Sequence, residues 1–170
     1  IGKKSNFYIK KVELIETLID QVIGSAKKIS MDLCPDILDL GIVAAIKWQV
    51  KEFCEKTELK YRFSCNNNAI LINTNLSVAI FRMFQEVLTN ISRHANATRI
   101  QIRLNEKDGW INLEITDNGI GISDHDTKKP QSYGIRTIRE RCQQLRGYLL
   151  ITTKLEKWTK ISISIPKNTN

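Results

Sequence analysis

The residues of this chain that are best suited to chemistry lie in three short stretches. The middle one is Asp117-Asn118-Gly119-Ile120-Gly121-Ile122, which follows an alternating run of apolar and polar residues at 110–116. The glycines Gly119 and Gly121 let a backbone turn at positive φ and approach a planar or anionic ligand closely. Asp117 would then accept a hydrogen bond from an amino group. From this stretch alone, an ordinary hairpin turn is an equally good interpretation.

The first stretch, residues 84–95, lies in a helical pattern that begins near the capping cluster Asn73-Thr74-Asn75. Its apolar residues fall on one broad face of the helix. They are Leu76, Ile80, Met83, Phe84, Val87, Leu88 and Ile91. Beside that face, Glu86 and Asn90 stack an acid and an amide four residues apart. This edge could line a cleft.

The third stretch, residues 132–141, places a glycine ahead of another amphipathic helix. The apolar stripe of that helix is Ile135, Ile138, Cys142 and Leu145. Free backbone amides at a helix N-terminus suit phosphate, so Gly134 would mark an anion site. One such glycine is weak evidence, whereas three stretches in this order are strong evidence together.

The three stretches together resemble a known family. They read Gln-Glu-x-Leu-x-Asn-x-x-Arg-His-Ala, Asp-Asn-Gly-x-Gly-Ile and Tyr-Gly-Ile-x-x-Ile-Arg-Glu-Arg. They are similar to the N, G1 and G2 boxes of two-component sensor histidine kinases, most closely the subfamily that signals to LuxR-type response regulators. Residues 32–42 resemble the segment that joins the family's dimerisation helices to its ATP-binding domain. The resemblance covers about residues 30 to 166.

The rest of the sequence predicts the elements that would position these stretches. We expect helices at 5–31 and 36–56, a helix that Gly147 ends, strands at 59–65, 69–72, 98–104, 110–116, 148–153 and 159–165, and a lid loop at 123–131. The expected fold class is therefore α+β, a two-layer α/β sandwich with a mixed sheet of about five strands and helices on one face. The resemblance implies the same architecture, the histidine-kinase-type ATPase fold.

Two domains are expected. Residues 1–57 predict a helical segment, in which apolar residues at steps of three and four look like part of a dimerisation region. Cys34-Pro35 interrupts that pattern, because proline removes a backbone donor. Residues 58–170 form the predicted ATP-binding catalytic domain.

The resemblance implies a role for each motif residue. Asn90 would bind Mg²⁺ together with the ATP phosphates, since this ion prefers oxygen ligands. Glu86 would be the catalytic base or water-orienting group. Arg93 and His94 would donate to phosphate, although a structural role for His94 is equally open. Asp117 would accept from the adenine amino group. The other implied nucleotide contacts are Gly119, Gly121, Ile122, Tyr133, Gly134, Ile135 and Thr159.

The chain departs from the family pattern in three places. Ser132 stands where a glycine is often found, and Glu156-Lys157-Trp158-Thr159 replaces a Gly-x-Gly-Thr run and keeps only the threonine. Neither His94 nor His125 lies in a dimerisation-helix context, so no phosphoacceptor histidine is evident.

Charge and composition restrict the partners. Ten cations and two carboxylates after residue 126 carry the whole net charge of +8. We interpret the lysines after residue 150 as a solvated surface, and the scattered aromatic residues make no base-stacking platform, so we expect no nucleic-acid partner. No run is long enough for a membrane span, so we expect no membrane contact by these residues. The cysteines are interpreted as reduced thiols in the cytoplasm, and an anchor elsewhere in the parent protein is left open.

The function that the resemblance implies is phosphoryl transfer from ATP, with Mg²⁺, to a histidine of the dimerisation domain. That histidine would pass the group to an aspartate in the receiver domain of a response regulator. The parent would be a homodimer. The alternative is a degenerate nucleotide-binding module that signals by conformation, and the intact Glu86, Asn90 and Asp117 favour the enzyme.

Overall fold

The computed structural model describes residues 36–122 and 133–168, and the chain from Asp36 onward forms one compact unit. The helix expected at 5–31 and the lid expected at 123–131 lie outside the described residues. No helix among the residues that are described is both long and apolar enough to cross a membrane.

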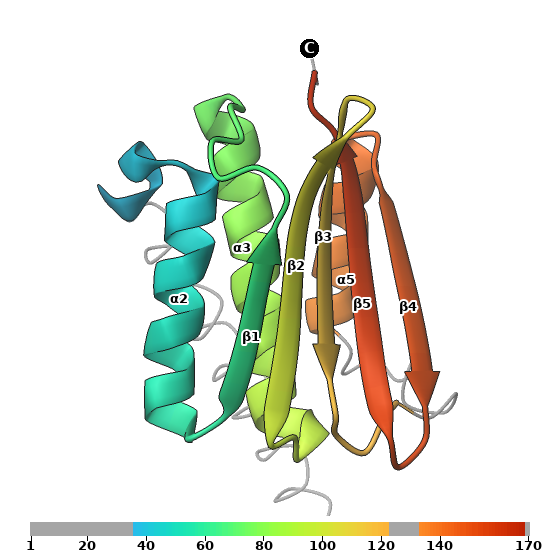
Figure 1. Cartoon of the computed structure of the whole chain (residues 1–170). Helices are drawn as coiled ribbons and strands as arrows, with labels where there is room; N and C mark the ends of the chain where they lie inside the picture. Colours follow the sequence, from blue (N-terminus) through green and yellow to red (C-terminus); the bar gives the residue numbers. More distant parts are fainter. Residues whose placement is uncertain (1–35, 123–132, 169–170) are drawn as a thin grey trace, which may run out of the picture. The chain divides into compact units, whose positions relative to one another are not determined.

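A five-stranded sheet forms one layer of the unit (Figure 1). Its strands are β1 (Lys60–Cys65), β2 (Arg99–Lys107), β3 (Trp110–Asp117), β4 (Tyr148–Lys154) and β5 (Trp158–Pro166). They lie in the order β1-β2-β3-β5-β4, with β1 parallel to β2 and all other pairs antiparallel. The sheet is therefore mixed, and the α+β sandwich predicted from the sequence is confirmed.

Helices cover one face of this sheet, as Figure 1 shows. They are α2 (Ile42–Thr57), α3 (Thr74–Asn90) and α5 (Tyr133–Gln144). The predicted cap of α3 is present, because the Asn73 side chain accepts from the backbone N–H of Leu76 at 2.8 Å. Since α2 packs against α3 and β1, this helix belongs to the same compact unit as the sheet.

Sulfur-containing side chains lie where α5 meets α3. Cys142 and Met83 are buried, with their sulfur atoms 3.6 Å apart. Burial raises the pKa of the Cys142 thiol to about 11, and the nearby charge of Arg139 opposes this rise. The thiol is therefore protonated at neutral pH and packs as a small apolar group.

Alternation along the strands decides which side chains face the helices. On β3, every second residue from Ile111 to Asp117 is buried. Asp117 therefore continues the row that faces the helices, whereas its neighbour Thr116 belongs to the opposite face of the sheet. This alternation places one carboxylate at the end of an otherwise apolar row.

Two predicted elements are wrong in detail. The single helix expected at 36–56 is a 3₁₀ turn, Asp36–Leu40, followed by α2, because Gly41 between them has φ 91° and interrupts the helix. The strand expected at 69–72 is absent and this segment has no regular structure. Its four residues are all apolar, but only Ile70 is buried, at 4% exposed, whereas Leu71 is 77% exposed.

Candidate functional site

The first part of the candidate site is formed where α5 begins against α3. Gly134, the second residue of α5, lies directly against the side chains of Glu86 and Asn90. A Cβ at position 134 would collide with Glu86 Oε1 and would lie 2.9 Å from Asn90 Oδ1. Two stretches that are far apart in sequence are thus in contact. Tyr133 begins the same helix, and Ile135 is half-buried next to Gly134.

Asn90 has an unmet hydrogen-bonding atom in this cluster. Its Nδ2 is buried and has no hydrogen-bond partner among the residues that the structure describes. Oxygen and nitrogen of an amide are assigned from their surroundings, so either atom could face a ligand. A buried polar group without a partner costs free energy unless a ligand satisfies it. The donor set of Glu86 and Asn90 beside a glycine backbone fits a magnesium and phosphate site.

Asp117 forms the second part of the site. It is 5% exposed, and its Oδ1 accepts from the backbone N–H of Gly119 at 2.8 Å. Burial raises the pKa of the Asp117 carboxyl above its ordinary value, while backbone amides of Gly119, Asp117 itself and Thr159 lower it. The carboxylate is therefore desolvated, and the backbone amides offset only part of the cost of burying its charge. A ligand that brings an amino group would stabilise the charged form.

Gly119 joins the end of the α3 region to the turn after β3. The φ of Gly119 is not positive, so this part of the expectation is wrong. Glycine is needed there because a Cβ would collide with Ala95 O and lie 2.8 Å from Ala95 C. The next residue, Ile120, donates its backbone N–H to Ala95 O at 2.8 Å. The Asp117 stretch is therefore no hairpin turn, and it packs against the residue that follows His94.

Gly121 does have the expected positive φ, 79°. A Cβ there would lie 2.8 Å from the carbonyl oxygen of Lys154 at the end of β4. The next residue, Ile122, donates its backbone N–H to the Thr153 hydroxyl at 2.9 Å. Thr159 lies opposite Asp117 on β5, is buried, and has its hydroxyl 3.4 Å from that of Thr153. The β4–β5 hairpin therefore supports the turn that follows Asp117.

Arg93 and His94 lie in a single π-helical turn, Ile91–Ala95, that extends α3. Both side chains are exposed, and neither has a hydrogen bond or ion pair within the described part of the chain. Asn96, in the left-handed conformation with φ 48°, ends the turn. Such π turns are often found at functional sites. The structure thus leaves the Arg93 guanidinium and the His94 imidazole available to an external anion, while the side chains nearest to Gly134 are those of Glu86 and Asn90.

Two contributors were missed by sequence reasoning. The Asn118 amide oxygen accepts from the backbone N–H groups of Thr98 and Arg99 at 3.0 and 2.8 Å, and so fixes the end of β3 to the start of β2. Thr153 contacts the turn through its hydroxyl. Asn118 lay inside a recognised motif, whereas nothing in the sequence around Thr153 signals its contact.

The family comparison decides what kind of domain this is. The family described as "Histidine kinase-, DNA gyrase B-, and HSP90-like ATPase" matches residues 75–169, more than half of the 170-residue chain. The chain belongs to this ATPase family. The match includes all three motif stretches and every strand except β1.

Relatives with curated names agree with this assignment. The chain is 32% identical over 162 residues to the signal transduction histidine-protein kinase/phosphatase DegS of Brevibacillus brevis, an alignment that covers 95% of this chain and 42% of DegS. It is 29% identical over 155 residues to the sensor histidine kinase MctS of Rhizobium johnstonii, covering 89% of this chain and 33% of MctS. The chain thus spans less than half the length of either relative.

Solved structures share the fold. The histidine kinase domain of the blue-light activated kinase from Erythrobacter litoralis EL346 superposes with a TM-score of 0.63 at 19% identity, covering 78% of this chain and 69% of that one. The Acinetobacter baumannii histidine kinase AdeS gives a TM-score of 0.65 at 15% identity, covering 91% and 84%. The five-stranded sheet with helices on one face is therefore the fold of histidine-kinase ATPase domains.

Proposed function

We propose that this chain is the catalytic ATP-binding domain of a sensor histidine kinase. It transfers the γ-phosphoryl group of ATP to a histidine of the dimerisation domain, for relay to a response-regulator aspartate. The observation that carries this proposal is the contact of Gly134 with Glu86 and Asn90, together with the buried carboxylate of Asp117. An acid, an amide and a glycine backbone meet in one cluster, and a separate acceptor lies at the end of β3.

Each group has a proposed task. Asp117 accepts from the amino group of adenine, which compensates its desolvated charge. Asn90 supplies one oxygen ligand to the Mg²⁺ that accompanies ATP, and the backbone around Gly134 approaches the phosphates. Glu86 acts on the reacting group as base or water-orienting residue. Magnesium, when bound, neutralises charge on the phosphates, and the exposed Arg93 adds a cation.

The proposal extends to the subfamily, the partner and the domain organisation of the parent protein. The forms of the motifs favour the subfamily that signals to LuxR-type regulators, with a receiver domain as partner. Residues 1–57 would supply part of the dimerisation region and the linker helix of a homodimeric parent. Residues 58–170 would be the catalytic domain, working in the cytoplasm.

Two variants separate binding from catalysis. Because Asn90 acts through magnesium, Asn90→Ala should weaken magnesium-dependent ATP binding by at least about tenfold. Because Glu86 acts on the reacting group, Glu86→Gln should leave ATP binding nearly unchanged and slow transfer by about 10²- to 10⁴-fold. The measurements are calorimetric titration with ATP, with and without Mg²⁺, and transfer of labelled phosphate to a separately supplied dimerisation domain that carries its histidine.

A matched control is Glu55→Gln, which changes an exposed acid on α2 that pairs only loosely with Lys51, at 3.8 Å. It should leave both readouts unchanged. Magnesium-independent ATP binding by the unaltered chain, with full transfer by both site variants, would instead support a degenerate module that signals by conformation. Acid-labile label on His94 or His125 of this chain alone would also contradict the assignment.

A further inference from the structure

The face of the sheet opposite the helices carries a concentration of cations. The strand registers place six outward-facing cations in three adjacent rows that run across the sheet. They are Lys60, Arg62, Arg99, Arg103, Lys154 and Lys160. Among the described residues, Glu114 is the one carboxylate in the same rows. Lys154 and Lys160, interpreted from the sequence as part of a solvated surface, therefore belong to a cluster, and we call these three rows the cationic face.

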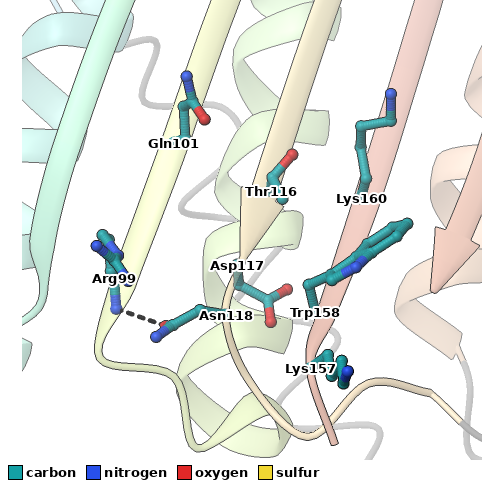
Figure 2. A pocket seen from close by; sticks show the side chains of 8 residues that line it. All are labelled: Arg99, Gln101, Thr116, Asp117, Asn118, Lys157, Trp158 and Lys160. Atoms are coloured by element: carbon teal, nitrogen blue, oxygen red, sulfur yellow. Dashed lines mark hydrogen bonds between the residues drawn. The ribbon is translucent and has the colours of Figure 1, made fainter. Parts of the chain in front are cut away.

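A depression of about 450 Å³ lies in the cationic face. Its lining residues are Arg99, Gln101, Thr116, Asp117, Asn118, Lys157, Trp158 and Lys160. Figure 2 shows Arg99 and Gln101 of β2 on one side, Trp158 and Lys160 of β5 on the other, and Thr116 of β3 between them. Lys157, from the β4–β5 turn, lies at the end nearest Asp117. The walls are thus cationic, the centre is neutral and polar, and the acidic residue Asp117 lines one end.

The charge of this face is only partly neutralised within the molecule. Glu114 is shared between Arg103 at 3.7 Å and Lys160 at 3.8 Å. The side chains of Arg99 and Lys157 are exposed and have no ion pair or hydrogen bond to any residue that the structure describes. Exposed ion pairs are weak, so these contacts leave most of the positive potential directed outward.

The cationic face and the candidate ATP site share Asp117, which lines one end of the depression, but their other residues differ. Asp117 belongs to the row that faces the helices, whereas Thr116 and Lys160, a cross-strand pair, belong to the opposite face. Glu86, Asn90 and Gly134 lie in the helical layer. Apart from Asp117, the residues of the two surfaces therefore lie on opposite faces of the sheet.

The extent of the cationic face indicates an extended partner. Arg99 and Arg103 are four residues apart on β2, which is about 13 Å along a strand, and the five strands span about 19 Å across. A single phosphate group would reach only two or three of these cations. An extended polypeptide covers about 3.3 Å per residue, so about six residues with several carboxylates would contact most of them.

The aromatic residues on this face favour protein over nucleic acid. Single-stranded nucleic acid is held by successive bases that stack on accessible rings. Trp158 is half-buried and is the one ring that lines the depression. Trp110, at the far end of β3, is already stacked on Tyr148 with ring centroids 5.4 Å apart. No continuous stacking surface is therefore offered among the described residues.

We propose that the cationic face is a docking surface for an acidic segment of a partner protein, with the depression between Arg99 and Lys160 as its centre. Carboxylates of that segment pair with the exposed cations, and Gln101 and Thr116 offer hydrogen bonds between them. Such a surface accelerates encounter and selects partners by charge, and its binding weakens as salt screens it.

The test uses the 170-residue chain and a fluorescently labelled peptide of about ten alternating aspartate and glutamate residues. Fluorescence anisotropy should show binding that weakens steeply with added salt. The double variant Arg99→Glu with Lys160→Glu should lower affinity by at least tenfold. The matched control Lys51→Glu with Lys56→Glu changes the net charge equally on α2, where both lysines are exposed, and should change affinity less than twofold.

ATP titration should be unchanged in all variants, because neither Arg99 nor Lys160 is a proposed nucleotide contact, and this separates docking from the proposed kinase site. Thermal unfolding checks that every variant is folded at the temperature of the binding measurement. Equal losses in the two double variants would show attraction to net charge alone and overturn the proposal. A labelled thymidine oligonucleotide of about ten residues, or vesicles of phosphatidylcholine with phosphatidylserine, serves as the competing probe. Tighter binding of either probe to the same face than of the acidic peptide would contradict the assignment to a protein partner.

Discussion

The Asp117 carboxylate is buried, and among the described residues its partners are backbone amides and not a cationic side chain. It accepts from Gly119 N–H, and burial raises its pKa despite the backbone amides that lower it. A group held this way costs stability in the free protein. We interpret this loss of folding stability as the consequence of a buried hydrogen-bond acceptor that serves to bind the amino group of a ligand.

Asp117→Asn should therefore stabilise the free protein at pH 7. Because the folded-state pKa of Asp117 is raised above its ordinary 3.8, ionisation is less favourable in the folded chain than in the unfolded one. Below pH 3.8 the carboxyl is protonated in both the folded and the unfolded wild type, so its ionisation costs no stability. As the pH rises from 3.8 through the raised folded-state pKa, the free energy of unfolding of the wild type falls. Asparagine has no such charge and retains an oxygen that accepts from Gly119.

The measurement is urea unfolding of both proteins at pH 7 and at successively lower pH. The variant should be the more stable at pH 7, and the difference should shrink as the pH approaches 3.8. A wild type that is the more stable at pH 7, or a difference independent of pH, would show that burial of the charge is not the dominant effect.

At the level of elements, the packing of α5 on α3 is set by one glycine. Gly134 allows the first turn of α5 to lie against Glu86 and Asn90. In an ordinary helix interior, replacing glycine by alanine stabilises by about 0.5 to 1 kcal/mol. Here the added Cβ must displace the Glu86 carboxylate and crowd the Asn90 amide.

Gly134→Ala should therefore weaken binding of ATP with Mg²⁺ by about 1 to 3 kcal/mol, the usual cost of overpacking. Gln143→Ala, an exposed change on the same helix, should leave binding unaltered. Calorimetric titration of both variants checks this. If Gly134→Ala binds as tightly as the wild type, the observed contact of α5 with Glu86 and Asn90 is not part of the binding site.

The elements also show how far sequence reasoning reaches. The strand pairs β2–β3 and β4–β5 were predicted because alternation and turn residues are local signals. Residues 69–72 are a short apolar run after a turn, which also favours a strand, but no strand lies beside them, and pairing partners are not encoded locally. Gly147 was expected to end the last helix, yet Arg146 takes the left-handed conformation, and a Cβ at Gly147 would collide with Ser164 and Ile165 of β5.

At the scale of the whole molecule, the three motif stretches were recognisable because each keeps its residue types and order. The contacts between these stretches were not predictable from periodicity. For example, position 119 must be glycine because a Cβ there would collide with the backbone of Ala95, which lies far away in sequence. The cationic face was also missed, since Arg99 and Lys160 come together only through the strand order β2-β3-β5. A tally of charge along the chain cannot show which face of a sheet each cation occupies.

The central claim is that this domain binds adenine nucleotide through Asp117. Titration calorimetry of the wild type and Asp117→Asn with ATP and with GTP, both with Mg²⁺, tests it most directly. The wild type should bind ATP at least about a hundredfold more tightly than GTP, because guanine carries a carbonyl oxygen where adenine carries the amino group that Asp117 accepts from. Asp117→Asn should weaken ATP binding by about 1 to 3 kcal/mol. Equal affinity of the wild type for both nucleotides, or of both proteins for ATP, would contradict the account.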